Sequence, residues 1–383
     1  MTLRICVVTG TRADYGLLAP VIDALKGDEA FKVQIAVTGM HLSPEFGLTF
    51  REIEADGHAI DAKVEMLLSS DTAVGAAKST GLGIVGFSDV FDRLSPDMVM
   101  MLGDRFEAMA AAIAALTARI PVAHLSGGDV TEGAFDEAMR HSITKMAHLH
   151  FVASASAAKR VRQLGEDPAR IHHVGDPGLD RVRTMTLMTR AEVEAALGFK
   201  LRRRNLLVTF HPATLDATPS MVQFEELLAA LAALPEDVGL VFTRPNADPE
   251  GRALIRRLDE FLVGRANAVA RASLGHKLYL ATMAQCDAVV GNSSSGLLEA
   301  PSLGKPSVNV GGRQDGRLRA ASVADCDPHR RTIAIAIESC WDKDWRGVDN
   351  PYGDGHAAER IVCVLKTLSD PPMLLKKRFH DLP

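Results

Sequence analysis

The strongest sign of chemistry in this sequence is the segment 291–296, Gly-Asn-Ser-Ser-Ser-Gly, which follows an apolar run and opens a helical stretch. Backbone N–H groups, the positive end of a helix and the hydroxyls of Ser293 and Ser294 would together suit a phosphate or diphosphate. A serine N-cap on an ordinary helix explains the same segment equally well when it is taken alone. Glu299, about one and a half turns into that helix, is placed to accept hydrogen bonds from ribose hydroxyls or to offset the helix dipole at the surface.

Two arginines lie in glycine-flanked loops that suit the same ligand. Arg12 stands in the segment 10–16, just before a helical stretch, and Arg313 stands in Gly-Gly-Arg-Gln at 311–314. Glycine allows a ligand to approach the backbone closely, and a guanidinium group binds phosphate through two parallel hydrogen bonds. Helix capping or solvent exposure explains either arginine alone. Taken with the serine segment, they indicate a diphosphate clamp.

A second set of residues suits proton transfer. Asp104 stands where the apolar run 98–102 ends, and His211 stands between an apolar run and Pro212. Histidine near carboxylates is a common acid–base arrangement at neutral pH, although a buried structural histidine is the simpler explanation of His211. Further carboxylates precede and open a helical stretch: Asp129, Glu132, Asp136 and Glu137. We expect Glu132 and Glu137 to be ordinary first-turn side chains, and we retain Asp129 and Asp136 as candidates with Asp104 and His211.

The elements that must position these residues form a repeating pattern. Short, continuously apolar runs alternate with longer helical stretches, which predicts α/β architecture with parallel sheets covered on both faces. A chain of 383 residues is long for one core, so we expect two doubly wound, Rossmann-like domains. We place the first at 1–177, the second at 178–370, and a C-terminal helix at about 371–383 packed back on the first. Ligands of such sheets bind at the carboxyl ends of the strands, where the polar loops fall.

Composition excludes several classes of protein. A net charge of −5 gives no basic surface for nucleic acid. The five cysteines are widely spaced and have neither disulfide-framework nor zinc-site spacing. No apolar stretch approaches the ~20 residues that span a bilayer, and no signal peptide is evident at the N-terminus. We therefore expect a cytoplasmic protein without membrane segments.

Read in order, the polar segments resemble the hydrolysing UDP-N-acetylglucosamine 2-epimerases of the sialic-acid pathway. The match covers nearly the whole chain and is specific when taken jointly: GTRADYG (10–16), GDRFE (103–107), GGDVTEGAFDEAMRHSITK (127–145), FHP (210–212), PNAD (245–248), GNSSSG (291–296) and GGRQ (311–314). The non-hydrolysing relatives differ after the first Gly-Thr and around 211–215.

The resemblance implies a GT-B fold whose two domains face a central cleft that holds a UDP-sugar. It implies loss of UDP from C1 with removal of the C2 proton, then addition of water to the resulting glycal, giving UDP and N-acetylmannosamine. It assigns the UDP contacts to Arg12, Ser293, Ser294, Glu299 and Arg313. It assigns the acid–base positions to Asp104, Asp136 and His211 without saying which group removes the proton. It further implies a homodimer, and we expect no cofactor and no metal requirement.

One departure from the family pattern bears on the substrate. The third residue of the His-x-x-Gly-Gly segment is a catalytic glutamate in the family pattern, and here it is Ser126. Asp129 or Glu132 would have to supply the lost charge, and Asp129 is the better placed in the loop. An altered sugar pocket is also what a change of substrate requires. UDP-N-acetylglucosamine remains the favoured substrate by a small margin over UDP-2,4-diacetamido-2,4,6-trideoxyglucose of the legionaminic acid pathway.

Two other functions stay open at this point. A GT-B glycosyltransferase would leave C2 of the sugar untouched, so it would incorporate no deuterium there in heavy water. A nucleotide-sugar sensor would bind without turnover, and the serine at position 126 is the only feature that suggests it. The epimerase is preferred because the other carboxylates and the histidine accompany the diphosphate clamp.

Overall fold

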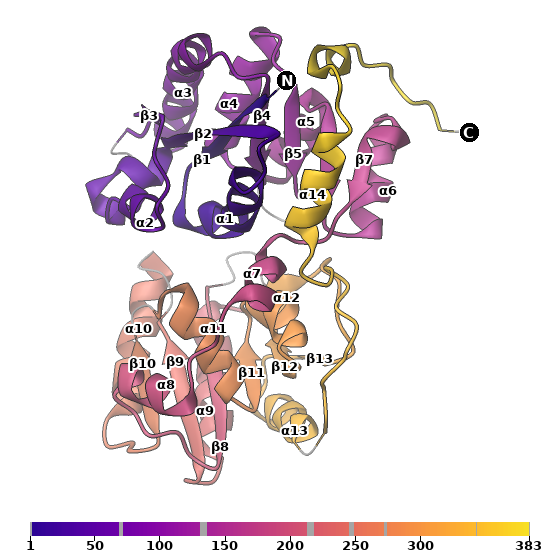
Figure 1. Cartoon of the computed structure of the whole chain (residues 1–383). Helices are drawn as coiled ribbons and strands as arrows, with labels where there is room; N and C mark the ends of the chain where they lie inside the picture. The colour runs from indigo at the N-terminus through magenta and orange to yellow at the C-terminus, as the bar shows by residue number, and fades with distance from the viewer. Residues whose placement is uncertain are drawn as a thin grey trace. The chain divides into compact units, whose positions relative to one another are not determined.

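The chain divides into two compact units in a computed structural model. The structure describes residues 2–68, 72–130, 136–212, 218–244, 249–271, 274–341 and 343–382. Unit 1 comprises Met1–Arg181 and Tyr352–Pro383, and unit 2 comprises Val182–Pro351 (Figure 1). Each unit is a parallel sheet with helices packed against it, as the alternating pattern predicts.

Unit 1 is built on a seven-stranded parallel sheet of order β3-β2-β1-β4-β5-β6-β7. Its strands are β1 (Leu3–Thr9), β2 (Phe31–Thr38), β3 (Ala62–Val64), β4 (Met98–Leu102), β5 (Val122–Leu125), β6 (Leu149–Val152) and β7 (Ile171–His173). The strand order reverses between β1 and β4, which pair in register from Ile5 with Met98. Such a reversal is the point where ligands of doubly wound sheets bind.

The α-helices of unit 1 cover the sheet with apolar faces. They are α1 (Arg12–Lys26), α2 (Phe50–Ala55), α3 (Ala73–Leu94), α4 (Phe106–Thr117), α5 (Asp136–Met146), α6 (Ala155–Gln163), α7 (Gly178–Thr184), which crosses into unit 2, and α14 (Ala357–Lys366). Short 3-10 helices lie at Gly39–Leu42 (η1), Pro44–Phe46 (η2), Pro168–Arg170 (η3) and Pro371–Leu375 (η5). Two clusters of buried side chains form the core, and their size accounts for the stability of so large a sheet.

Unit 2 repeats the plan with a six-stranded parallel sheet of order β10-β9-β8-β11-β12-β13. Its strands are β8 (Arg204–Thr209), β9 (Val238–Thr243), β10 (Ala268–Arg271), β11 (Ala288–Gly291), β12 (Ser307–Val310) and β13 (Val323–Cys326). The order reverses between β8 and β11, which pair from Ala288 with Leu206 to Gly291 with Thr209. The second binding edge is therefore formed by the segments that follow these two strands.

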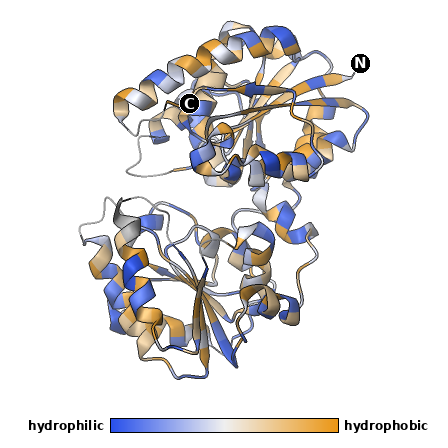
Figure 2. Cartoon of the chain, turned by 90° about the vertical axis from the view of Figure 1, so that its left-hand side faces the viewer, coloured by the Kyte–Doolittle hydropathy of each residue, from blue (hydrophilic) through white to orange (hydrophobic). Residues whose placement is uncertain are grey.

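The helices of unit 2 are α8 (Arg190–Leu197), α9 (Ser220–Ala232), α10 (Pro249–Leu262), α11 (Gly275–Gln285), α12 (Ser295–Ser302) and α13 (Arg330–Cys340), with η4 at Gly312–Gln314. In Figure 2 the strands of each sheet are coloured mainly as hydrophobic, whereas the helices carry hydrophobic and hydrophilic residues in alternation. This is the pattern of a two-sided buried sheet with amphipathic helices. The α/β class expected from the sequence is confirmed.

The boundaries differ from those expected. The chain passes from unit 1 to unit 2 after Arg181 and returns at Tyr352, rather than at 177/178 and about 371. The returning helix is α14, which packs on α1, and the expected helix at 371–383 is wrong. Pro371 and Pro372 lie at the start of η5, a single 3-10 segment. Proline is compatible with the first turn of a helix, but the turn ends at Leu375 and the following residues to 382 continue as an irregular segment.

Candidate functional site

The first half-site lies at the strand reversal of unit 1, around Asp104. Asp104 follows β4 and accepts a hydrogen bond from the Arg140 side chain, which projects from α5. Arg140 is 8% exposed, so this is an ion pair shielded from water. Breaking such a pair from one side leaves an uncompensated charge. Asp104 is therefore held in one orientation by a helix that begins with another predicted site residue, Asp136.

Asp136 is the first residue of α5, and its pKa is raised. Burial is the largest cause, and the neighbouring Asp104 carboxylate raises it further, against Arg105 and Arg140, which lower it. A neighbouring carboxylate disfavours a second negative charge on Asp136. Asp104 and Asp136, predicted separately from sequence, are brought together in this way.

Another carboxylate near Asp104, that of Glu107, is buried. Glu107, in the first turn of α4, is 2% exposed and receives both Nε and Nη2 of Arg105 at 3.1 Å. A Cβ at Gly10 would lie 3.2 Å from Cβ of Glu107, and one at Gly39 would lie 2.8 Å from its Oε1. Because Gly10 and Gly39 have no side chains, there is room for Glu107 beside the ends of β1 and β2. Glu107 therefore lies where three loops of the half-site meet.

The loop that carries Arg12 is fixed by Asp14. Thr11 caps α1, and Asp14 completes a capping box while also accepting from Gly10 N–H at 3.0 Å and from the Thr9 hydroxyl. Burial raises the pKa of Asp14 to about 6 against these hydrogen bonds. The Thr9 hydroxyl also lies 3.0 Å from Nε2 of His41. Arg12 itself is half-exposed, 3.9 Å from Glu52.

The end of β5 supplies backbone geometry more than titratable groups. His124 is fully buried, with Nε2 2.7 Å from the Gly103 carbonyl, and burial lowers its pKa to about 3. Ser126 has φ of 61° and donates its N–H to Phe151 O at 3.0 Å. A non-glycine residue in this left-handed region is uncommon and often marks a functional turn.

Asp129 follows that turn and is partly exposed. The carbonyl of the preceding Gly128 accepts from Arg160 on α6 at 3.0 Å, so the backbone before Asp129 is anchored toward α6. Its role as replacement for a glutamate at 126 stays a prediction. Glu132 lies within residues 131–135, which are outside the described residues. Residues 213–217 and the Pro-Asn-Ala-Asp segment at 245–248 also lie outside them.

The second half-site, in unit 2, is organised by Asn292. The side chain is fully buried; Oδ1 accepts from His211 N–H at 2.7 Å and Nδ2 donates to His211 O at 2.8 Å. The Asn292 carbonyl accepts from Nη1 of Arg313 at 3.0 Å and from Nε2 of Gln314 at 2.8 Å. One asparagine thus ties the ends of β8 and β11 to η4, and places His211 and Arg313 at one edge.

Hydroxyl groups gather at the start of α12. Ser293 Oγ lies 2.9 Å from Ser295 Oγ, and Ser295 also contacts the hydroxyl of Tyr279 on α11. Ser294 occupies the N-cap position but makes no side-chain cap bond, so the helix does not use it as an ordinary cap. Glu299 is partly buried on the same helix. The predicted residues Ser293, Ser294 and Glu299 therefore share one helix with its N-terminus at the strand reversal.

Comparison with known proteins gives the family. The model of the family described as UDP-N-acetylglucosamine 2-epimerase matches residues 23–366. The chain belongs to this epimerase family. It is an enzyme of the family, and the two-domain fold that the resemblance predicts is confirmed.

This epimerase is similar to several named relatives over most of its length. It is 39% identical over 85% of its length to a Campylobacter jejuni protein named GDP/UDP-N,N'-diacetylbacillosamine 2-epimerase (hydrolyzing), covering 84% of that protein. It is 36% identical over 98% of its length to a Legionella pneumophila protein named UDP-N,N'-diacetylbacillosamine 2-epimerase (hydrolyzing), covering 99% of it. It is 31% identical to a Neisseria meningitidis UDP-N-acetylglucosamine 2-epimerase, over 99% of both chains.

Solved structures agree on the fold of this epimerase. The Neisseria meningitidis UDP-GlcNAc 2-epimerase bound to UDP-GlcNAc matches with a TM-score of 0.75 and 20% identity, over 96% of this chain and all of the other. A putative UDP-N-acetylglucosamine 2-epimerase from Listeria monocytogenes matches with a TM-score of 0.79 and 20% identity, over the full length of both. At this identity the likeness is one of fold.

Several residues of the epimerase half-sites were not assigned a role from the sequence. Arg105, Glu107 and Arg140 stand inside the family-like segments, but their burial and pairing are visible only in three dimensions. Asp14 and His41 carry no motif that distinguishes them from capping or core residues. For Asp14 the capping spacing from Thr11 was the available signal.

No group of three or more His, Cys, Asp or Glu side chains within the described ranges is arranged to hold a metal ion. No helix in the same ranges is long and apolar enough to cross a membrane.

Proposed function

We propose that this epimerase hydrolyses UDP-N,N'-diacetylbacillosamine, which is UDP-2,4-diacetamido-2,4,6-trideoxyglucose, and inverts C2 to release UDP and the free 2-epimeric sugar. The Campylobacter jejuni and Legionella pneumophila relatives, 39% and 36% identical, bear this substrate in their names, the first together with its GDP counterpart. The sequence alone favours UDP-N-acetylglucosamine slightly; the relatives favour the other sugar. Ser126 is consistent with it, since a small neutral side chain suits a sugar that carries an additional acetamido group.

In this proposal the reaction couples removal of the C2 proton to loss of the diphosphate. C2–H of the sugar is not adjacent to a carbonyl, so its proton leaves only as the C1–O bond to UDP breaks and the C1=C2 bond forms. Stabilising the departing diphosphate is then a large part of catalysis. In the second step water adds OH at C1 and a proton is returned to C2 from the opposite face.

The carboxylates of unit 1 supply the proton-transfer groups in this proposal. Asp104, oriented by Arg140, and Asp136, whose pKa is raised, offer one acid and one base in a single half-site. His211 adds a neutral-pH group from unit 2, and Asp129 is the remaining candidate. The pairing of Asp104 with Arg140 beside Asp136 is the observation that carries the proposal.

The UDP end is assigned to unit 2, with Arg12 added from unit 1. Ser293, Ser294 and the start of α12 would receive the diphosphate, with Arg313 beside them and Glu299 toward the ribose. Asn292 keeps Arg313 and the loop after β11 in place. A free product of this kind is a precursor of sialic-type acids, in keeping with a 34% identical Escherichia coli relative named polysialic acid biosynthesis protein P7.

The substrate assignment is tested by comparing sugars directly. The protein is incubated in heavy water with UDP-N,N'-diacetylbacillosamine, its GDP counterpart or UDP-N-acetylglucosamine, and products are identified by NMR. We expect free 2-epimeric sugar deuterated at C2, with kcat/KM for the first substrate about tenfold or more above the third. Sugar transfer without deuterium at C2, or a preference for UDP-N-acetylglucosamine, contradicts the proposal.

The division of labour is tested by one variant in each half-site. Asp104→Asn retains shape but removes the carboxylate, so turnover should fall by roughly a hundredfold or more while UDP affinity stays within about twofold. Arg313→Ala should instead weaken UDP binding roughly tenfold or more. Calorimetry with UDP and a UDP-release assay measure the two quantities, and the opposite pattern would exchange the roles.

We also propose that the enzyme works as a homodimer joined through α3. The outward face of this helix exposes Val74, Leu82 and Val85 at 63%, 45% and 64%. Lys78 and Asp89, both exposed, lie on the same face because eleven residues make about three helical turns. In an antiparallel pair of α3 helices whose two-fold axis passes between residues 83 and 84, Lys78 faces Asp89 of the second copy and Leu82 faces Val85.

A further inference from the structure

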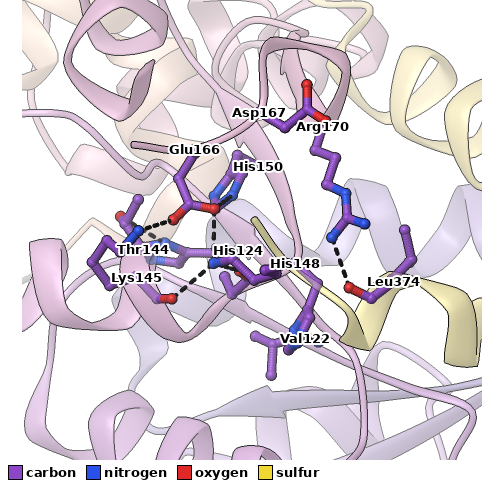
Figure 3. Close-up of polar contacts among 12 residues, drawn as sticks. Val122, His124, Thr144, Lys145, His148, His150, Glu166, Asp167, Arg170 and Leu374 are labelled. Atoms are coloured by element: carbon purple, nitrogen blue, oxygen red, sulfur yellow. Dashed lines mark hydrogen bonds and ion pairs between the residues drawn. The ribbon is translucent and has the colours of Figure 1, made fainter. Parts of the chain in front are cut away.

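Glu166 is a buried carboxylate in unit 1, at the end of the sheet opposite the sequence motifs. Two lysines and one histidine contact it. Glu166 is 1% exposed. Its oxygens lie 2.6 Å from Lys145 Nζ, 3.0 Å from His150 Nε2 and 2.7 Å from Lys377 Nζ. Figure 3 shows Lys145 and His150 beside Glu166. These partners hold the pKa of Glu166 down at about 2 in spite of its burial. A charge so deeply buried requires all of its partners.

Lys377 is the partner that comes from the C-terminal segment. Its ammonium group also donates to the carbonyls of Lys145 and Ala147, at 2.8 and 2.6 Å. An ammonium group has three N–H donors, and Lys377 has an acceptor for each. Two of the three are carbonyls at the C-terminal end of α5, where backbone oxygens have no partner within the helix and a cation is favoured by the helix dipole.

Residues 371–382, the C-terminal strap, are fastened around this lysine. Nη1 and Nη2 of Arg170 donate to Leu374 O and Lys376 O, at 2.6 and 3.1 Å, and Figure 3 shows the first of these contacts. His380 N–H donates to Gly165 O at 2.9 Å. The ring of Phe379 covers Gly165, where a Cβ would collide with it. The strap therefore places Lys377 by backbone contacts that do not involve its own side chain.

The helix that Lys377 caps is the one that carries the proposed catalytic residues. From its capped end, α5 runs back through Thr144, whose hydroxyl donates to Arg140 O at 2.9 Å and lies 3.3 Å from Nδ1 of His124. It continues through Arg140, which pairs with Asp104, to Asp136 at its first residue. A rigid helix transmits a displacement of one end to the other.

We propose that Lys377 is a positioning residue for the reaction: by capping α5 and neutralising Glu166, it sets the placement of Arg140, Asp104 and Asp136. This inference rests on the proposed function, since those residues are its acid–base groups. Lys377 lies at the opposite end of α5 from Asp136, so its loss should lower kcat and leave UDP binding, assigned to unit 2, unchanged. A misplacement of about 1 Å at reacting groups costs up to roughly a hundredfold in rate.

The kinetic test compares Lys377→Met with Lys376→Met. Lys376 is the exposed neighbour on the same strap, and its backbone contact to Arg170 is kept in the variant. We expect Lys377→Met to lower kcat between tenfold and a hundredfold, with the Kd for UDP within about twofold of the wild type, and Lys376→Met to retain wild-type kcat. Equal kcat in both variants, or a matching loss of UDP affinity, overturns the inference.

Two further measurements separate positioning from general destabilisation. A pocket of about 220 Å³ lies beside Glu166 and Lys377, so propylammonium has access to the space vacated in Lys377→Ala and should restore at least part of kcat. Neutral propanol at the same concentration is the control. Restoration by both compounds, or by neither, contradicts a role for the ammonium charge.

Amide hydrogen exchange tests whether Lys377 stabilises α5, and it does so without requiring turnover. In Lys377→Met, amides of α5 should exchange about tenfold or more faster, while those of α12 in unit 2 stay unchanged. If the wild-type protein converts none of the three sugar nucleotides, the proposed function fails, and exchange at α5 still decides whether Lys377 caps this helix. Unchanged exchange at α5 overturns the inference by itself.

Discussion

Several histidines of unit 1 are buried, and for three of them burial lowers the pKa to about 4 or about 3. His41 and His124 are fully buried and His148 is 2% exposed, and burial lowers their pKa values to about 4, 3 and 4. Nδ1 of His148 accepts from Val122 N–H at 3.1 Å, a hydrogen bond that needs a neutral ring. Neutral imidazole is therefore part of the fold around β5 and the Arg12 loop.

The lowered pKa values predict a loss of stability in mild acid. Below the ordinary histidine pKa of about 6.5 the unfolded chain takes up protons that the folded chain refuses, so stability is complete above pH 6.5 and falls toward pH 4. Asp14 acts in the opposite direction. Its pKa in the folded protein is about 6, so as the pH falls the folded chain takes up this proton before the unfolded chain does, which stabilises the fold. For these four groups the net is about two protons, or roughly 3 kcal/mol per pH unit near pH 5.5; the lowered pKa values of His58 and His150 act in the same direction as those of the three histidines.

Urea unfolding between pH 7.5 and 5 measures this slope. His148→Asn keeps an acceptor for Val122 N–H and should reduce the slope by about one proton, close to 1.4 kcal/mol per pH unit. His173→Gln, at an exposed histidine, should leave it unchanged. A slope that His148→Asn does not alter would show that other groups govern the acid transition.

How far single residues were predictable depended on whether their evidence was local. Asp104 and the serine segment at 293–294 were found because each directly follows an apolar strand, and the carboxyl ends of parallel strands mark binding edges. Glu107 was not, because its burial depends on Gly10 and Gly39, distant in sequence. The same holds for Arg140, whose partner Asp104 lies in another loop.

At the scale of elements, the junction of β8 and β11 is the tightest part of the candidate site. Gly291 has φ of 133°, and a Cβ there would collide with the Thr209 carbonyl oxygen. The next residue, Asn292, donates its N–H to that same oxygen at 3.1 Å. Glycine at 291 thus allows the two strands to end side by side and allows Asn292 to reach His211.

Gly291→Ala should therefore damage both the fold and the UDP edge. The strained backbone and the collision together predict a loss of about 3 kcal/mol or more in the free energy of unfolding, with UDP affinity reduced. Denaturant unfolding and UDP calorimetry check the two effects. Gly16→Ala, where a Cβ in α1 meets no atom within 4 Å, should be neutral or slightly stabilising by up to about 1 kcal/mol; equal behaviour of the two variants contradicts the prediction.

Helix α3 shows why some elements escaped sequence analysis. It contains Gly75, Gly81, Gly83 and Gly86, and glycine disfavours helix by about 1 kcal/mol each. In the structure a Cβ at Gly83 would lie 2.9 Å from Cβ of Ala110, and one at Gly86 would lie 2.7 Å from Val64. Close packing on α4 and β3 thus outweighs local propensity, and packing partners are not visible in a linear pattern.

At the scale of the whole molecule, the returning segment is the feature that the sequence described least well. The alternation of apolar runs and helical stretches predicts two α/β units because continuously apolar strands indicate a parallel sheet covered by helices on both faces. The return to unit 1 at Tyr352 depends on contacts between distant segments, such as Asp180 accepting from the N–H groups of Ala357 and Ala358 at 2.9 and 2.6 Å. Such contacts between distant segments are not visible in the sequence. The local signal was the pair Pro371 and Pro372, so the return to unit 1 was predicted there.

The outward face of α3 makes a prediction for assembly. In the proposed two-fold pair, Lys78 of each copy meets Asp89 of the other, so the contact is isologous and one substitution changes it twice. Lys78→Glu should place like charges together at both ends of the seam and weaken the dimer by roughly tenfold or more in Kd. Asp89→Lys should do the same.

The double variant Lys78→Glu with Asp89→Lys restores opposite charges at both ends and should regain the wild-type dimer, a result that a general effect on folding does not produce. Sedimentation velocity over a range of protein concentrations measures each Kd. Lys32→Glu, on an exposed position of β2, controls for the change in net charge. A monomeric wild-type protein, or a double variant as weak as either single one, would exclude this face of α3 as the seam, because only facing charges are rescued by exchange.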